Sequence, residues 1–149
     1  MRVVVGEGSC GLAAGAGKVR AALEKAGADV GITGCIGMCY LEPIVDLYDG
    51  ERETGNGEPG TLLARLVRVK ESDAERIFKA AESGDLSGVA DLAIKPEDEE
   101  FLAKQTRIAL RHCGIIDPES LDAYRAADGY KAIAKILGVD GGPDRKSVV

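Results

Sequence analysis

Residues 1–33 contain a strand, a helix and a second strand in close succession, and this order restricts the fold more than any other feature of the sequence. Residues 2–5 (RVVV) are mostly β-branched, and residues 29–33 again favour a strand. Between them, residues 12–26 place apolar side chains at helical spacing, and Gly27 follows where a helix would end. This pattern predicts two parallel strands joined by a right-handed crossover.

Two further strands and a helix are predicted after this unit. Residues 43–48 (PIVDLY) and 62–69 (LLARLVRV) flank a polar, glycine-rich stretch, as the two strands of an antiparallel hairpin do. Residues 72–82 then favour a helix with an inward stripe made of Ala74, Ile77, Phe78 and Ala81. The order βαβ-ββα predicts an α/β fold of thioredoxin-like topology.

Three of the four cysteines follow the two parallel strands. Cys10 is predicted in the loop after the first strand, and Cys35 and Cys39 in the loop after the second. Because the carboxyl ends of neighbouring parallel strands share one edge of a sheet, we expect the three sulfur atoms to converge there. In a chain without secretion signals, clustered cysteines indicate a metal or redox site more than structural disulfides.

The spacing of these cysteines favours an iron–sulfur site over a dithiol enzyme. Cys35 and Cys39 form a C-x3-C pair after a strand, whereas thioredoxin-like redox enzymes use C-x2-C. Gly34 and Gly37 leave backbone N–H groups free to approach a negatively charged cluster.

Cys113 and His112 lie far along the chain, near the end of a helix predicted between Pro96 and Gly114. We interpret Cys113 as a buried, inert thiol and His112 as a partner of the helix C-terminus. A zinc site formed by the three clustered thiols and His112 remains an alternative.

The second half is predicted to be a short all-α extension. The helix from Pro96 would present Phe101, Ile108 and Leu110 on one side, and a second helix would begin with Asp117 as N-cap and Pro118 as first helical residue. A last helix is expected over residues 130–137. Three short amphipathic helices without a sheet need a partner to cover their apolar sides.

Charge and hydropathy exclude several classes of partner. The chain has 19 basic and 25 acidic residues, a net charge of −6, which argues against non-specific binding to nucleic acid or anionic membranes. No apolar run approaches the roughly 18–20 residues that span a bilayer, and no signal-peptide pattern is present. We therefore expect no nucleic-acid partner, no membrane insertion, and a cytoplasmic location, free or on the cytoplasmic face of a membrane complex.

The segments VVVGEGSCGLAAGA (residues 3–16) and TGCIGMCYLEPIVD (residues 33–46) resemble the thioredoxin-like [2Fe-2S] ferredoxin module of NADH dehydrogenases and NAD(P)-linked hydrogenases. That family holds its cluster with four thiolates, in a C-x4-C and a C-x3-C. The resemblance implies that Cys10, Cys35 and Cys39 are cluster ligands, whereas Val5 stands at the fourth cysteine position. An oxygen ligand from Ser9, or a vestigial site retained for docking, are the alternatives to an all-thiolate cluster.

Residues 101–137 (FLAKQTRIALRHCGIIDPESLDAYRAADGYKAIAKIL) resemble the segment before the FMN-binding domain in the NADH-binding flavoprotein subunit of bacterial NADH:quinone oxidoreductase (complex I), and in related hydrogenases and formate dehydrogenases. The resemblance implies an N-terminal ferredoxin-type domain over residues 1–92 and a helical lead-in over residues 93–143. FMN, NADH and a [4Fe-4S] cluster would belong to the full-length parent, because no residue here matches their sites. Partners would be the parent's C-terminal domains and other subunits; a stand-alone ferredoxin is the alternative.

The last six residues, 144–149, can be encoded by a nucleotide string that matches a common sequencing adapter. We therefore expect this tail to be non-native and leave it out of the fold prediction.

Overall fold

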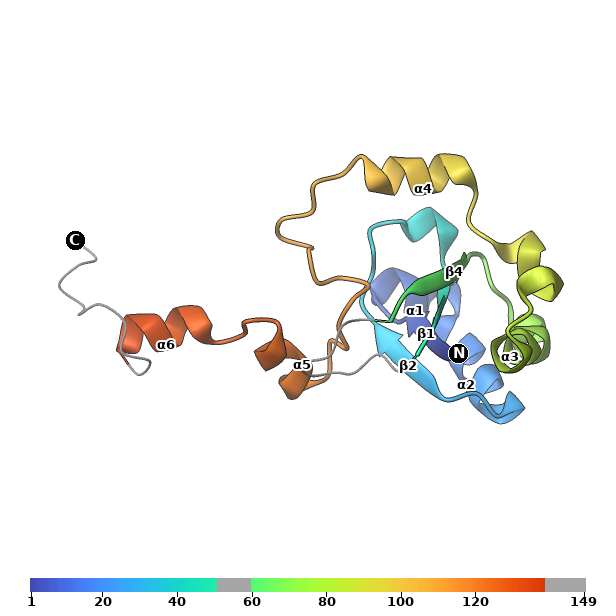
Figure 1. Cartoon of the computed structure of the whole chain (residues 1–149), viewed down its shortest axis with the longest axis horizontal. Coiled ribbons are helices and arrows are strands. Elements are labelled where there is room, and N and C mark those ends of the chain that lie inside the picture. The colour runs from blue at the N-terminus through green and yellow to red at the C-terminus, as the bar shows by residue number, and fades with distance from the viewer. Residues whose placement is uncertain (51–59, 139–149) are drawn as a thin grey trace.

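A computed structural model describes residues 1–50 and 60–138, so the expected non-native tail and most of the hairpin turn lie outside the described residues. Four strands form one mixed sheet in the order β2-β1-β3-β4 (Figure 1). Strand β1 (Arg2–Gly6) pairs parallel with β2 (Val30–Thr33) and antiparallel with β3 (Val45–Tyr48), and β3 pairs antiparallel with β4 (Leu62–Leu66). The predicted α/β class is confirmed, and the topology is compatible with a thioredoxin-like domain.

The connection between β1 and β2 contains two helices, α1 (Ser9–Ala14) and α2 (Ala16–Ala26), where the sequence predicted one. Gly15 separates them with φ of 103°, a left-handed conformation that interrupts helical hydrogen bonding and suits glycine. Since α1 begins at Ser9, the prediction that Cys10 lies in a loop was wrong. Cys10 belongs to the first turn of a helix.

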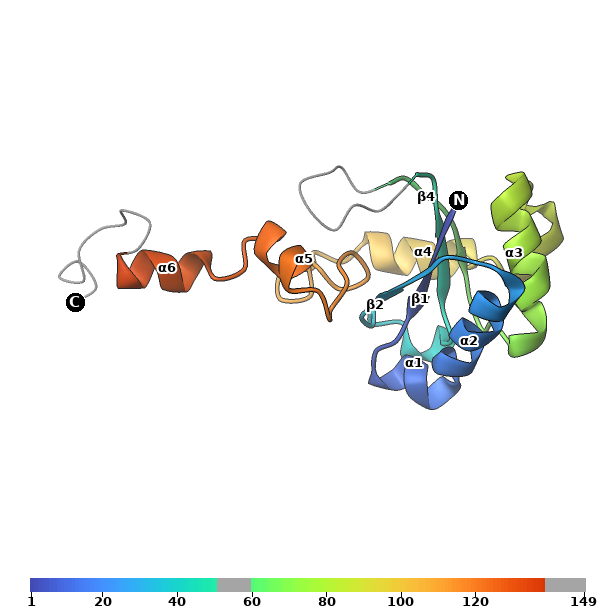
Figure 2. The ribbon, with the colours of Figure 1, turned by 90° about the horizontal axis from the view of Figure 1, so that it is seen from below.

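One face of the sheet carries the main hydrophobic core. Alternate residues of β1 and β3 point to this face, where α2 and α3 (Ala74–Ser83) lie side by side (Figure 2). A 3-10 turn, η2 (Glu71–Asp73), precedes α3, and a second one, η3 (Leu86–Leu92), follows it. The fully buried side chains on this face include Val3, Val5, Leu23, Val45, Leu47 and Ile77.

A smaller apolar cluster covers the opposite face. It joins the segment between β2 and β3 to the chain after β4, and Leu102 of α4 (Pro96–Ala103) packs against it. Its buried members are Ile36, Met38, Leu41, Ile44, Val67 and Ile94. The segment that carries Cys35 and Cys39 is therefore anchored by buried side chains between the two cysteines and after Cys39.

The helical extension differs from its prediction in three places. The helix from Pro96 ends at Ala103 rather than near Gly114. Ile108, Leu110 and Cys113 therefore lie beyond it, and the prediction that Ile108 and Leu110 line one side of this helix was wrong. The next helix, α5 (Leu121–Ala126), is capped by Ser120, whose hydroxyl accepts a hydrogen bond from the Ala123 N–H. Asp117 accepts from the Glu119 N–H in the preceding turn and is not the N-cap.

The last helix, α6 (Lys131–Leu137), begins one residue later than predicted. Helices α5 and α6 extend away from the sheet (Figure 1). Their exposed apolar side chains include Leu121, Tyr124, Ile133, Ile136 and Leu137. None of the helices in the described residues has the length and apolar character needed to cross a membrane.

Candidate metal centre

Three cysteine sulfur atoms meet at the edge of the sheet where β1 and β2 end. Cys10 comes from α1, Cys35 from the loop after β2, and Cys39 from the start of a short 3-10 helix, η1 (Cys39–Leu41). All three Sγ atoms lie within 4.8 Å of one another. The Sγ of Cys35 is 3.1 Å from that of Cys10 and 3.6 Å from that of Cys39. The convergence expected from the parallel strand pair is present.

The two cysteine-bearing segments are held together by backbone contacts. Gly6 pairs with Thr33 at the end of the parallel ladder, and the Glu7 N–H donates to the Thr33 carbonyl at 2.8 Å. Gly8 then passes so close to Cys35 that a Cβ at Gly8 would lie 2.7 Å from the Cys35 Cβ. A side chain larger than hydrogen at Gly8 would push Cys35 away from Cys10.

Gly37 provides a backbone donor to the cluster of sulfurs. Its N–H donates to the Cys35 Sγ at 3.3 Å, with Gly37 in the left-handed region at φ of 92°. Backbone N–H groups that point at sulfur stabilise negative charge on thiolates and on iron–sulfur clusters. This contact agrees with the role expected for Gly37; the same role for Gly34 stays a prediction.

Glu42 adds a carboxylate to the site that sequence reasoning did not identify. Its side chain is buried, its Oε2 accepts a hydrogen bond from the Ile44 N–H at 2.9 Å, and its Oε1 lies 3.7 Å from the Cys10 Sγ. Burial raises the pKa of the Glu42 carboxyl above its usual range. The position three residues after Cys39 was a usable signal, because it places Glu42 in the same short segment as two clustered cysteines.

The surroundings of Cys10 and Glu42 favour the protonated forms of these two groups, or a bound cation beside them, over the unpaired anions. Burial, followed by the neighbouring Cys35 and Cys39 thiols, raises the pKa of the Cys10 thiol to about 12. Within residues 1–50 and 60–138, no lysine or arginine forms an ion pair with Glu42. A metal ion held by these residues would supply positive charge, and its thiol ligands would be deprotonated.

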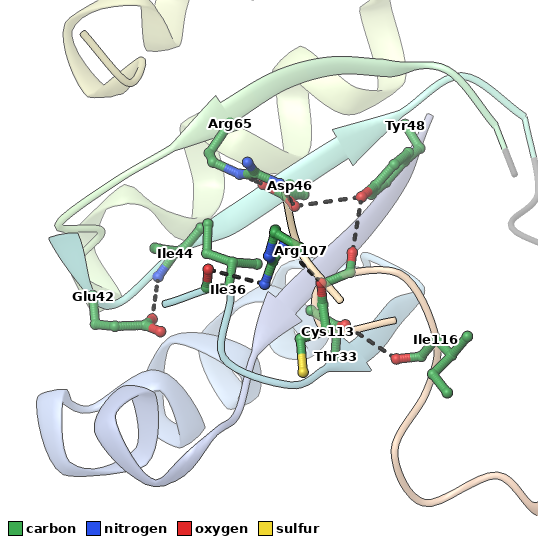
Figure 3. Close-up of polar contacts among 11 residues, drawn as sticks. Thr33, Ile36, Glu42, Ile44, Asp46, Tyr48, Arg65, Arg107, Cys113 and Ile116 are labelled. Atoms are coloured by element: carbon green, nitrogen blue, oxygen red, sulfur yellow. Dashed lines mark hydrogen bonds and ion pairs between the residues drawn. The ribbon is translucent and has the colours of Figure 1, made fainter. Parts of the chain in front are cut away.

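A strap formed by residues 107–116 fastens the loop that carries Cys35 (Figure 3). The Arg107 guanidinium donates to the Ile36 carbonyl at 3.1 Å and to the Cys113 carbonyl at 3.3 Å. The Thr33 hydroxyl donates to the Ile116 carbonyl at 3.1 Å. The strap thus contacts Thr33 before Cys35 and Ile36 after it, although it lies more than 70 residues away from them in the sequence.

The other candidate donors are placed away from the three sulfurs. Among the described residues, the group of potential metal ligands consists of Cys10, Cys35 and Cys39 and includes neither Cys113 nor His112. Cys113 is half-buried, and the Nε2 of His112 accepts a hydrogen bond from the Arg111 Nε at 2.9 Å. The alternative of a zinc site completed by His112 is therefore not supported.

Val5, which stands at the family's fourth cysteine position, and Ser9, the alternative oxygen ligand, lie in different surroundings. Val5 is fully buried in the main aliphatic core, and Ser9 is exposed at the start of α1. Val5 has no donor atom, whereas the Ser9 hydroxyl, directly before Cys10 in the sequence, stays an alternative oxygen ligand. The ligand role of the three cysteines themselves stays a prediction.

Comparison with known proteins gives one informative match. No protein-family model matches the chain. A stretch of 34 residues is 62% identical to part of the NADP-reducing hydrogenase subunit HndC of Solidesulfovibrio fructosivorans. The match covers 23% of this chain and 7% of that protein, so the chain corresponds to a small part of its relative. This local similarity stands beside the group of three cysteine sulfurs, whose arrangement could hold a metal ion.

Proposed function

We propose that the sheet domain is a one-electron carrier that holds a [2Fe-2S] cluster through Cys10, Cys35 and Cys39. The observation that carries this proposal is the group of three sulfur atoms within 4.8 Å of one another, brought together from α1 and the loop after β2. Soft thiolate ligands select iron–sulfur clusters, zinc or cuprous ions. A [2Fe-2S] cluster would accept one electron from a reduced flavin or iron–sulfur donor and give it to an oxidised iron–sulfur acceptor.

The chain's own residues have two tasks in this function. The Gly37 N–H, which already donates to the Cys35 Sγ, would stabilise the reduced cluster's extra negative charge. The Arg107 guanidinium fixes the Ile36 carbonyl and holds the loop in place while adding a positive charge near it. Both features would raise the reduction potential of the cluster above that of a cluster held by the same three thiolates without these contacts.

We further propose that the chain forms the N-terminal part of a flavoprotein subunit in an NADH-oxidising complex of the hydrogenase or complex I type. Residues 1–92 would be the ferredoxin-type domain and residues 93–143 the helical lead-in. The identity with part of HndC and the two sequence resemblances support this assignment. FMN, NADH and a [4Fe-4S] cluster would be bound by other domains of the cytoplasmic parent, and other subunits would be its partners.

The test is anaerobic purification followed by iron and sulfide analysis and electron paramagnetic resonance. We expect about two iron and two acid-labile sulfide ions per chain, and a signal that appears after reduction with dithionite. Replacement of Cys35 and Cys39 by Ala should abolish both, whereas replacement of Cys113 by Ala should leave both unchanged. A colourless, iron-free protein after anaerobic reconstitution with iron and sulfide would contradict the proposal.

A docking module without a redox centre is the second candidate. The exposed apolar side chains of α5 and α6 favour it, because such residues are normally covered in a stable assembly. In that case the wild-type protein and a variant with Cys10, Cys35 and Cys39 replaced by Ala would bind a partner subunit with equal affinity.

A further inference from the structure

A two-iron cluster normally takes four protein ligands, and the clustered cysteines provide three. The question is which neighbouring side chain offers the fourth donor atom. Glu42 has its Oε1 3.7 Å from the Cys10 Sγ. Glu42 thus offers a side-chain oxygen that already contacts the sulfur of Cys10.

We propose that the Glu42 carboxylate is the fourth ligand of this centre and binds the same metal ion as Cys10. The inference rests on the proposed function, since it assumes that the three cysteines hold a two-iron cluster. It identifies the site as a Cys3Glu site with one all-thiolate iron and one iron of mixed sulfur and oxygen ligation.

Two of the donor distances suit a division of the four donors into two pairs, one for each metal ion. Donor atoms on one tetrahedral metal ion with bonds of about 2.3 Å lie about 3.8 Å apart. The Cys35 and Cys39 sulfurs are 3.6 Å apart, and the Cys10 sulfur and Glu42 oxygen are 3.7 Å apart. Glu42 is outside the group of donors that all lie within 4.8 Å, which favours two metal ions over a single ion with four ligands.

The pocket around Glu42 orients one oxygen toward Cys10. The Ile44 N–H occupies Oε2, and this leaves Oε1 to face the sulfur. Gly11 lies close to the carboxylate, because a Cβ at Gly11 would lie 3.2 Å from Oε2, which is tighter than an ordinary contact. A carboxylate that is only 8% exposed and lacks a basic partner in the described part of the chain carries an electrostatic cost that a metal ion removes.

The sulfur of Cys10 is also 3.1 Å from that of Cys35, which is closer than ligands of two different metal ions. Binding of a two-iron cluster therefore requires these side chains to separate. Cys39 is exposed and Cys35 is half-buried beside it, so both can change rotamer toward solvent. Cys10 and Glu42 can remain in place as the inner pair.

The experiment compares the wild-type protein with Glu42→Ala, Glu42→Gln, Glu42→Cys and the control Ser9→Ala after the same anaerobic reconstitution. Ser9 is the matched control, because it is an exposed oxygen-bearing residue adjacent to Cys10. Iron content, Mössbauer spectra and circular dichroism of the metal-free fold are measured for each. The Gln variant keeps the shape of Glu42, so it remains informative where the Ala variant fails to fold.

We expect two distinct ferric sites in the wild-type Mössbauer spectrum and in Ser9→Ala. Glu42→Ala and Glu42→Gln should bind iron at least about tenfold more weakly, since even loss of a residue that only supports a metal ligand costs about 10–100-fold in affinity. Glu42→Cys should bind iron and show two nearly equivalent all-sulfur sites.

Wild-type spectra and iron content in both Glu42→Ala and Glu42→Gln would overturn the assignment of Glu42 while leaving the iron–sulfur function intact. Absence of iron from the wild-type protein would instead contradict the proposed function. Loss of iron in Ser9→Ala with retention in Glu42→Gln would assign the oxygen ligand to Ser9 and refute the inference.

Discussion

The Sγ atoms of Cys10 and Cys35 lie 3.1 Å apart, although 25 residues separate them in the sequence. One comes from the first turn of α1 and the other from the loop after β2. The parallel pairing of β1 and β2, together with the close passage of Gly8 beside Cys35, sets this distance.

Replacement of Gly8 by Ala should disrupt the site, because the new Cβ would lie 2.7 Å from the Cys35 Cβ. We expect a loss of about 1–3 kcal/mol in the free energy of unfolding, as in other overpacked sites, and weaker iron binding. Urea denaturation and iron titration measure the two effects. Gly17→Ala in α2 is the control: its Cβ would be 3.8 Å from Leu12, and the free energy of unfolding should rise by about 0.5–1 kcal/mol.

Alkylation of the metal-free, reduced protein should distinguish the cysteines. A pKa of about 12 leaves the Cys10 thiol protonated between pH 7 and pH 9, and the protonated thiol is a poor nucleophile. We expect iodoacetamide to modify the exposed Cys39 first and Cys10 last, as followed by peptide mass spectrometry. Rapid modification of Cys10 at pH 8 would contradict the arrangement of the thiols and Glu42.

Replacement of Arg107 by Ala should loosen the loop that carries Cys35. The variant removes two hydrogen bonds from a charged donor to the Ile36 and Cys113 carbonyls, and the free energy of unfolding should fall by about 1–3 kcal/mol. Hydrogen exchange of amides in residues 34–39 should accelerate. Arg111→Ala is the control, since Arg111 is exposed and its side chain contacts the adjacent His112; equal exchange in both variants would exclude a role of the strap.

Replacement of Asp46 by Ala should strongly destabilise the sheet. Asp46 is 2% exposed in β3 and accepts two hydrogen bonds from Arg65 of β4, at 2.8 and 2.7 Å (Figure 3). Removing one partner of a buried pair leaves the other charge uncompensated and costs about 3–5 kcal/mol. Thermal and urea unfolding measure the loss, and Asp91→Ala, which breaks an exposed pair with Arg76, should leave stability unchanged within error.

Sequence patterns were sufficient for the elements whose signals are local. The β-branched run of β1, the apolar segments of β3 and β4 and the stripe of α3 each indicated their structure, and the parallel pair predicted the meeting of Cys10, Cys35 and Cys39. Local signals failed at Gly15, where a left-handed residue divides a continuous helical pattern. They also failed after Ala103, because the predicted helix continued toward Gly114 whereas the helix of the structure ends at Ala103.

The sequence by itself therefore determined the order of strands and the edge at which three sulfurs gather, because periodicity and strand direction depend on neighbouring residues. Only the tertiary structure decided that Glu42 turns inward beside Cys10 and that the strap of residues 107–116 holds the Cys35 loop. Burial of a carboxylate and the docking of a distant segment both depend on packing between residues far apart in the chain. These contacts stabilise the protein only once the domain is folded, so they produce no hydrophobic periodicity that can be recognised in the sequence.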